Sequence, residues 1–157
     1  MPHIHTEPGQ VDHTVEVFVV FSNKVLLRKH DKYGIWLSVG GHIELDEDPN
    51  QAALREVKEE VGLDISLYSP TKMPTFEQAD YTELIPPIFL NRHRINASHE
   101  HVTYTYLAIC KNDKIKPEHP DDIWEWFSEN DLNSREKEIR ASILYYARTA
   151  LKTLAEK

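Results

Sequence analysis

The chain has 157 residues, of which 40% are hydrophobic and 28% are charged, and these values are typical of one globular domain spanning residues 1–157. The formal net charge of −8 argues against non-specific binding to nucleic acid or to an anionic membrane. The single cysteine, Cys110, excludes an intrachain disulfide. The first residues lack a secretion pattern and no apolar run is long enough to span a bilayer, so we expect a cytoplasmic protein.

The chain begins with a predicted hairpin. Apolar and polar residues alternate over 13–21 and then become fully apolar, which predicts a strand that enters the core. A turn at 22–23 leads to a partner strand at 24–28. A short strand at 36–39 follows and is expected to lead into a glycine turn at 40–41.

A helix is predicted from Pro49 to Val61. Asp48 is a good N-cap, and Gln51 lies three residues later, where its side chain can complete a capping box. Gly62 suits the left-handed position that commonly ends a helix. The residues expected to pack inward share one arc of the helix: Ala53, Leu54, Val57 and Val61.

Three glutamates fall on a neighbouring arc of this helix: Glu56, Glu59 and Glu60. Like charges at these spacings repel by about 0.2–0.5 kcal/mol per pair, and the helix dipole disfavours negative charge in the last turn. Most acidic arcs are simply solvated surfaces. A hard divalent cation among the oxygens would offset the repulsion, and Mg²⁺ prefers carboxylate oxygen ligands.

The second half of the chain predicts more strands and one helix. Strands are expected at 65–68, resuming near 75–77, and at 88–92, 101–110 and 123–127. The residues at 91–100 are polar and predict a loop. A last helix is predicted from Asn133 or Ser134 to about Ala155. Strands surrounding two helices favour an α/β fold with a mixed sheet between helical layers.

One stretch has a specific spacing: Gly41-x5-Glu47-x7-Arg55-Glu56-Val57-x-Glu59-Glu60-x-Gly62-Leu63. It resembles the signature of the Nudix hydrolase family at every fixed position, and a chance match is on the order of 10⁻⁷. The resemblance implies an α/β/α sandwich. It also implies that this stretch forms a loop, a helix and a loop that present carboxylates to a cleft.

Nudix hydrolases split a diphosphate bond in a nucleoside diphosphate linked to another group. The resemblance therefore implies Mg²⁺-dependent hydrolysis of a small nucleotide-type substrate, with Mn²⁺ as a substitute metal. It implies no membrane or nucleic-acid polymer as a partner, and it allows a homodimer because family members are often dimers. The alternative is a non-catalytic Nudix-like module that binds a nucleotide or acts as a sensor.

The resemblance also assigns residues to roles. The metal ligands it implies are Glu56, Glu59, Glu60 and the backbone carbonyl of Gly40. Glu56 or Glu59 would activate water. Arg55, which the family pairs with Glu47, would hold and polarise the neighbouring carboxylates, and a plain structural salt bridge is the simpler role for that pair. The expected catalytic residues are thus Glu56, Glu59 and Arg55.

Several further residues stay open. Asp121, Asp122 and Glu118 precede the strand at 123–127, where the family often supplies another acidic ligand, but each is more often a solvated carboxylate. The histidines are His42, which directly follows the glycines, and His93, His99 and His101; no pair has a specific zinc-ligand spacing. Candidates for base stacking or phosphate contact are Tyr33, Trp36, Phe76, Tyr81, Tyr104, Tyr106, Arg28, Lys32, Arg92 and Arg94.

Overall fold

The computed structural model describes residues 7–30 and 32–155. The strands of this part are β1 (Val11–Phe21), β2 (Lys24–Lys29), β3 (Trp36–Leu37), β4 (Val39–His42), β5 (Ile65–Leu67), β6 (Phe89–Asn96), β7 (His99–Cys110) and β8 (Ile123–Phe127). The helices are α1 (Pro49–Val61), α2 (Glu129–Ser134) and α3 (Ala141–Thr153), with a 3₁₀ turn at Glu136–Glu138.

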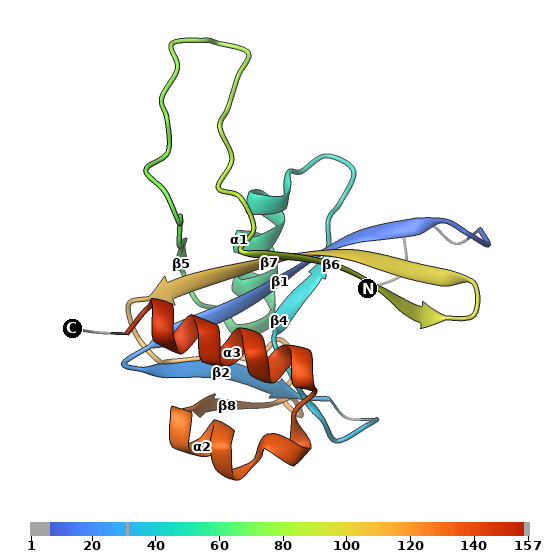
Figure 1. Ribbon diagram of the computed structural model, residues 1–157, viewed down its shortest axis with the longest axis vertical. Helices are drawn as coiled ribbons and strands as arrows, with labels where there is room; N and C mark the ends of the chain where they lie inside the picture. The colour runs from blue at the N-terminus through green and yellow to red at the C-terminus, as the bar shows by residue number, and fades with distance from the viewer. Residues whose placement is uncertain (1–6, 31, 156–157) are drawn as a thin grey trace.

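The eight strands of the described chain form one sheet with helices on both faces (Figure 1). Its main order is β3-β2-β1-β7-β5, with β4 paired to β1, β6 to β7 and β8 to β2. The central pair, β1 and β7, is parallel, whereas the other pairs are antiparallel. The predicted α/β/α sandwich with a mixed sheet is therefore confirmed.

Strand β1 separates two hydrophobic cores. Val15, Val17 and Val19 face α1, where they pack in one cluster with the buried side chains of that helix. Phe18 and Val20 point the other way, into a cluster with α2 and α3. Because successive side chains of a strand point to opposite faces, β1 contributes side chains to both cores.

Helix α1 has the predicted bounds and caps. The Asp48 carboxylate accepts from the backbone of Gln51, whose side chain bonds back to Asp48, and Gly62 is left-handed at φ 70°. One prediction for this helix is wrong. Leu54 is 43% exposed, and Ala52 occupies the buried arc instead.

The predicted C-terminal helix is wrong in its bounds. A short helix, α2, starts with its own capping box between Ser128 and Asp131, and α3 begins only at Ala141. Between them Ile139 is extended, pairs with Trp36 as an isolated bridge and is buried. Burial of this side chain in the core draws the chain out of helical geometry.

The predicted polar loop at 91–100 is also wrong, because these residues form the outer part of the β6–β7 hairpin. Strand β6 is mostly exposed, so it lacks the apolar alternation by which strands are predicted. An ion pair between Arg92 and Glu100 links the two strands.

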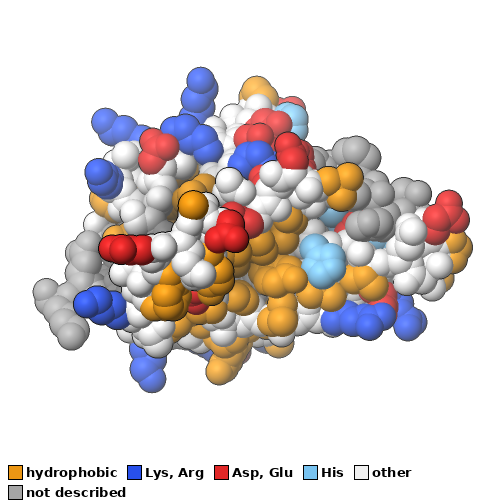
Figure 2. Space-filling view, turned by 90° about the horizontal axis from the view of Figure 1, so that it is seen from above, with side chains coloured by type: hydrophobic (Ala, Val, Ile, Leu, Met, Phe, Trp, Pro, Cys, Tyr) orange, Lys and Arg blue, Asp and Glu red, His pale blue; other side chains and the backbone are white. Residues whose placement is uncertain are grey.

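Residues 68–88 form a long loop that projects from the sheet (Figure 1), and the strand predicted near 75–77 does not form. The returning end is fixed to α1, since the Asn50 amide both accepts from and donates to the backbone of Ile85, at 2.8 and 3.0 Å. Figure 2 views the molecule from above and shows hydrophobic side chains on this surface with charged groups around them. No helix of the described ranges is long and apolar enough to cross a membrane.

Candidate active site

Arg55 connects the signature loop to the signature helix. Its Nε and Nη2 donate to the two oxygens of Glu47, at 3.0 and 2.6 Å. Its Nη1 donates to both Glu56 Oε1, at 2.9 Å, and Glu59 Oε2, at 3.0 Å. Nη2 also reaches the backbone oxygen of His42 at 2.9 Å. One guanidinium thus fixes two carboxylates of α1 relative to β4, which is the role that the planar, five-donor group suits best.

The electrostatics of this network follow from the same contacts. The hydrogen bonds from Arg55 lower the pKa of Glu47 and raise that of Arg55 itself. Glu56 is almost fully buried, and this desolvation raises its pKa although the charge of Arg55 opposes the shift. A buried carboxylate whose charge is only partly compensated attracts a further cation.

Gly40 and Gly41 lie inside strand β4, so the predicted glycine turn is wrong. Neither residue has a positive φ. Their importance is close packing: a Cβ at Gly40 would collide with the backbone oxygen of Val15, and a Cβ at Gly41 would collide with the carboxylate of Glu56. The missing side chain at Gly41 therefore creates the space in which Glu56 lies.

Glu60, one turn after Glu56 on α1, accepts a hydrogen bond from the Gly40 N–H at 3.2 Å. Burial raises its pKa to about 7, and the Gly40 N–H opposes this shift. Arg28 and Asp122, which pair at 2.7 Å, lie close enough to influence the Glu60 charge.

The three acidic residues left open next to β8 have different positions. Asp122 is close to the site through its ion pair with Arg28, whereas Asp121 is exposed. The Glu118 N–H donates to the backbone oxygen of Glu60 at 2.9 Å, and its exposed side chain faces His119 at 4.0 Å. Of these three, Asp122 is the one whose charge acts on the carboxylate of Glu60.

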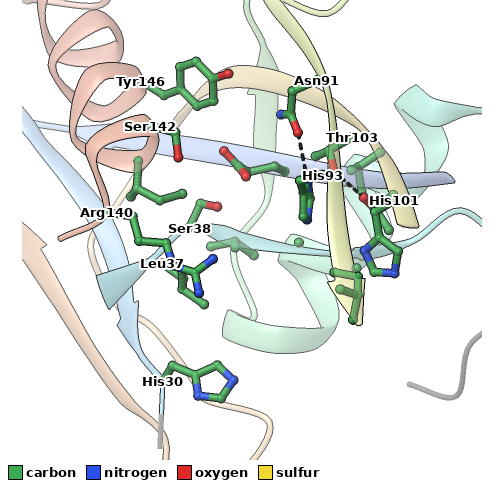
Figure 3. A pocket seen from close by; sticks show the side chains of 18 of the residues that line it. His30, Leu37, Ser38, Asn91, His93, His101, Thr103, Arg140, Ser142 and Tyr146 are labelled. Atoms are coloured by element: carbon green, nitrogen blue, oxygen red, sulfur yellow. Dashed lines mark hydrogen bonds between the residues drawn. The ribbon is translucent and has the colours of Figure 1, made fainter. Parts of the chain in front are cut away.

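A cavity of about 710 Å³ lies on the α3 face of the sheet, next to the glycine pair. Figure 3 shows Arg140, Ser142 and Tyr146 on one side of it and Asn91 and His93 on the other. Its lining includes Gly40 and Gly41 but none of the signature carboxylates. The glycine strand thus lies between the cavity and the acidic side chains of α1.

Glu16 is the lining residue that sequence reasoning missed. Its Oε1 is buried and accepts no hydrogen bond from the described residues, while the Ser38 side chain bonds to the carboxyl group. Burial raises the Glu16 pKa to about 7, and the bond from Ser38 opposes the shift. The signal was present in the sequence, because Glu16 is the one charged residue in the otherwise apolar stretch between Val15 and Phe21.

The aromatic candidates separate into three groups. Trp36 and Tyr106 are buried in the cores, whereas Tyr33 lines the cavity. Phe76 and Tyr81 contact each other edge to face in the projecting loop, with ring centroids 5.4 Å apart. Among the basic candidates, Arg94 lines the cavity and Arg92 is paired with Glu100.

A family model described as NUDIX domain matches residues 12–147, which include both the signature and the cavity. The chain belongs to the NUDIX family. A dihydroneopterin triphosphate diphosphatase of Haemophilus influenzae is 34% identical over 115 residues, which cover 70% of each chain. An m7GpppN-mRNA hydrolase of Xenopus laevis is 35% identical over 109 residues, but these are 66% of this chain and only 34% of that protein.

Solved structures agree with the NUDIX assignment. A NUDIX-family hydrolase from Clostridium perfringens is 36% identical, covers 91% of this chain and 97% of its own, and superposes with a TM-score of 0.82. The predicted family and the predicted enzyme class, a Nudix-type diphosphate hydrolase, are confirmed.

Proposed function

We propose that this NUDIX protein hydrolyses a diphosphate bond in a small nucleotide-type substrate with Mg²⁺ as its metal, and that Mn²⁺ can substitute. The observation that supports this best is the double role of the glycine strand. Gly40 and Gly41 line the cavity on one side, while Gly40 contacts Glu60 and Gly41 adjoins Glu56. In this proposal a substrate held in the cavity extends its phosphates past the glycine strand to the carboxylates of α1.

The donor set fits a hard divalent cation. Glu56, Glu59 and Glu60 offer carboxylate oxygens and Gly40 offers a backbone carbonyl, and the side-chain-free surface of Gly41 leaves room for Glu56. When bound there, Mg²⁺ neutralises charge on the diphosphate and lowers the pKa of a coordinated water. Binding also favours the ionised forms of Glu56 and Glu60, whose pKa values burial raises.

The residues of the chain then have separate tasks. Glu56 or Glu59 accepts the proton of the attacking water. Arg55 positions both, because its Nη1 donates to each of them. Glu47 fixes the guanidinium through two further bonds, so that the carboxylates keep one geometry while charge develops on the substrate. Arg28, near Glu60, is a cation suited to the departing phosphate.

The cavity favours a heterocycle that offers two neighbouring N–H donors. The buried Oε1 of Glu16 lacks a partner among the described residues, and a carboxylate accepts two parallel N–H bonds. Guanine presents such an edge, and so does the pterin ring of the substrate named for the Haemophilus influenzae relative. Tyr33 and Tyr146 supply aromatic surface to the same cavity.

The test is a substrate panel with Mg²⁺ and with Mn²⁺: GTP, ATP, dihydroneopterin triphosphate, ADP-ribose, diadenosine polyphosphates and nucleotide sugars. Release of phosphate or diphosphate is measured for the wild type, for E60Q and for E136Q, which removes an exposed carboxylate away from the site. We expect turnover that needs metal, that E60Q lowers and that E136Q retains.

A second variant tests the choice of heterocycle. E16Q replaces one carboxylate oxygen with an amide, so it should lower kcat/KM for guanine or pterin substrates by about 10–100-fold, the scale of one charged hydrogen bond, with little effect on adenine substrates. Turnover without metal, or full turnover in E60Q, would contradict the proposed site. Ligand binding with no turnover of any substrate would favour a non-catalytic sensor.

A further inference from the structure

A group of histidines gathers around a buried aspartate at one end of the cavity, away from the signature carboxylates. Asp12 of β1 pairs in register with His101 of β7, and Thr14 pairs with His42 of β4. Asp12 and Thr14 lie two residues apart, so their side chains face the same side of the sheet. We call Asp12, His42, His99 and His101 the histidine–aspartate cluster.

The distances within this cluster are those of a metal site. Ligand atoms of Asp12, His42 and His101 all lie within 4.8 Å of one another, and Oδ2 of Asp12 is 3.3 Å from Nε2 of His42. Bonds of about 2.0–2.1 Å to a tetrahedral zinc ion place two ligand atoms about 3.3–3.4 Å apart. The Asp12 and His42 atoms already have this separation.

The chemistry of the donors selects the type of ion. Two imidazole nitrogens and one carboxylate oxygen suit zinc and similar transition metals, whereas Mg²⁺ prefers oxygen ligands alone. Asp12 is fully buried beside the imidazole rings of His42 and His99, and a metal ion at this place would add positive charge next to its carboxylate. We propose that Asp12, His42 and His101 bind one divalent transition-metal ion of the zinc type, at a site separate from the signature carboxylates.

His99 supports this site from outside the ligand set. Its Nε2 lies 3.2 Å from the same Asp12 oxygen, and it is buried. Residues in such positions orient a ligating carboxylate through a hydrogen bond. His93 is the partner of His101 in the β6–β7 register, with the two rings 5.6 Å apart, and it is an exposed neighbour of the site.

The site links the sheet to the active site. The three ligands come from β1, β4 and β7, so one ion joins three strands. His42 is the next residue after Gly41, and its backbone oxygen accepts from Arg55. His42 and His101 also line the cavity. A bound ion therefore stabilises β4 at the place where the cavity and the Arg55 network meet.

The test is calorimetric titration of Zn²⁺ into the metal-free protein in a buffer with excess Mg²⁺, which occupies oxygen sites but competes poorly for imidazole. We expect one stoichiometric Zn²⁺ site, and with Co²⁺ as the probe we expect visible absorption bands of a four- or five-coordinate ion. Zn²⁺ should also raise the Tm of the wild type, because it binds only the folded state.

The variants separate ligands from neighbours. H101Q changes a partly buried position that tolerates substitution. It should lower the affinity for Zn²⁺ by more than about 100-fold and abolish the Tm rise. H99Q should lower the affinity for Zn²⁺ by about 10–100-fold, as expected for a residue that contacts a ligand and not the ion. The matched control is H119Q, an exposed histidine outside the cluster, and E59Q controls for the signature carboxylates; both should bind like the wild type.

If D12N folds, it should bind Zn²⁺ more weakly than the wild type, as expected when a carboxylate ligand is lost. The result for H101Q tests the proposal whether or not D12N folds. Equal Zn²⁺ affinity in the wild type and H101Q would overturn the proposal. So would the lack of stoichiometric binding by the wild type, or a loss of binding in E59Q as large as that in H101Q.

Discussion

Arg55 and Glu47, eight residues apart in sequence, form a two-bond ion pair across the start of the signature helix. R55K keeps the charge but removes the fork that reaches Glu47, Glu56 and Glu59 together. We expect kcat to fall about 100-fold because the carboxylates lose their alignment. Steady-state kinetics with Mg²⁺ measure this effect. R92K, which changes an exposed paired arginine elsewhere, should leave kcat unchanged.

The two neighbouring glycines should respond differently to the same substitution. In G41A the new Cβ meets the carboxylate of Glu56, which can move, so the fold should persist while activity is lost. In G40A the new Cβ meets the backbone oxygen of Val15, which cannot move, so the free energy of unfolding should fall by about 1–3 kcal/mol. Urea unfolding and kinetics on both variants check this. A stable, fully active G40A would show that the close strand contact is not needed.

E60Q separates the demands of stability from those of catalysis. Burial disfavours the ionised form of Glu60, so the neutral amide should leave the metal-free protein as stable as the wild type or more so at neutral pH. The same change should lower metal-dependent kcat by about 10²–10³-fold, the scale of one preorganised electrostatic group. Thermal unfolding without metal and kinetics with Mg²⁺ provide the two measurements. An unstable, inactive E60Q would instead indicate a purely structural role.

Glu16 should make stability depend on pH. Its pKa is about 7 in the folded protein and near 4.5 when unfolded, so the folded state holds the proton more tightly. The stability from this group is fully present below about pH 4.5 and is lost as the pH rises to about 7, a change of about 3 kcal/mol. Only the wild type loses this contribution, because the amide of E16Q does not titrate. In urea titrations E16Q should therefore become more stable relative to the wild type as the pH rises from about 4.5 to about 7. A constant difference would mean that Glu16 has the same pKa in the folded and unfolded states.

Much of this arrangement could be predicted from local sequence signals. The caps of α1 are formed by Asp48, Gln51 and Gly62 as predicted, because capping depends on side chains within one turn. The signature spacing likewise identified the family. These features require no knowledge of distant contacts.

Features that depend on distant contacts were not predicted. Ile139 leaves the helix because it packs beside Trp36, about a hundred residues away in sequence. The inner part of β6 matches the strand predicted at 88–92, but its outer part, up to Asn96, is too exposed to show alternation and was predicted as a loop. His42 and His101 come together only through the register of β4, β1 and β7, so their sequence spacing carried no metal signal.

Gly40 and Gly41 lie between the cavity and the carboxylates of α1, so in the proposed function the heterocycle is recognised on one face of this strand and the anhydride is cleaved on the other. Natural or laboratory evolution can therefore exchange Glu16, Ser38 or Tyr146 to accept a new leaving group while the reaction centre stays intact. A scaffold divided in this way can change its substrate specificity while it keeps the same catalytic residues.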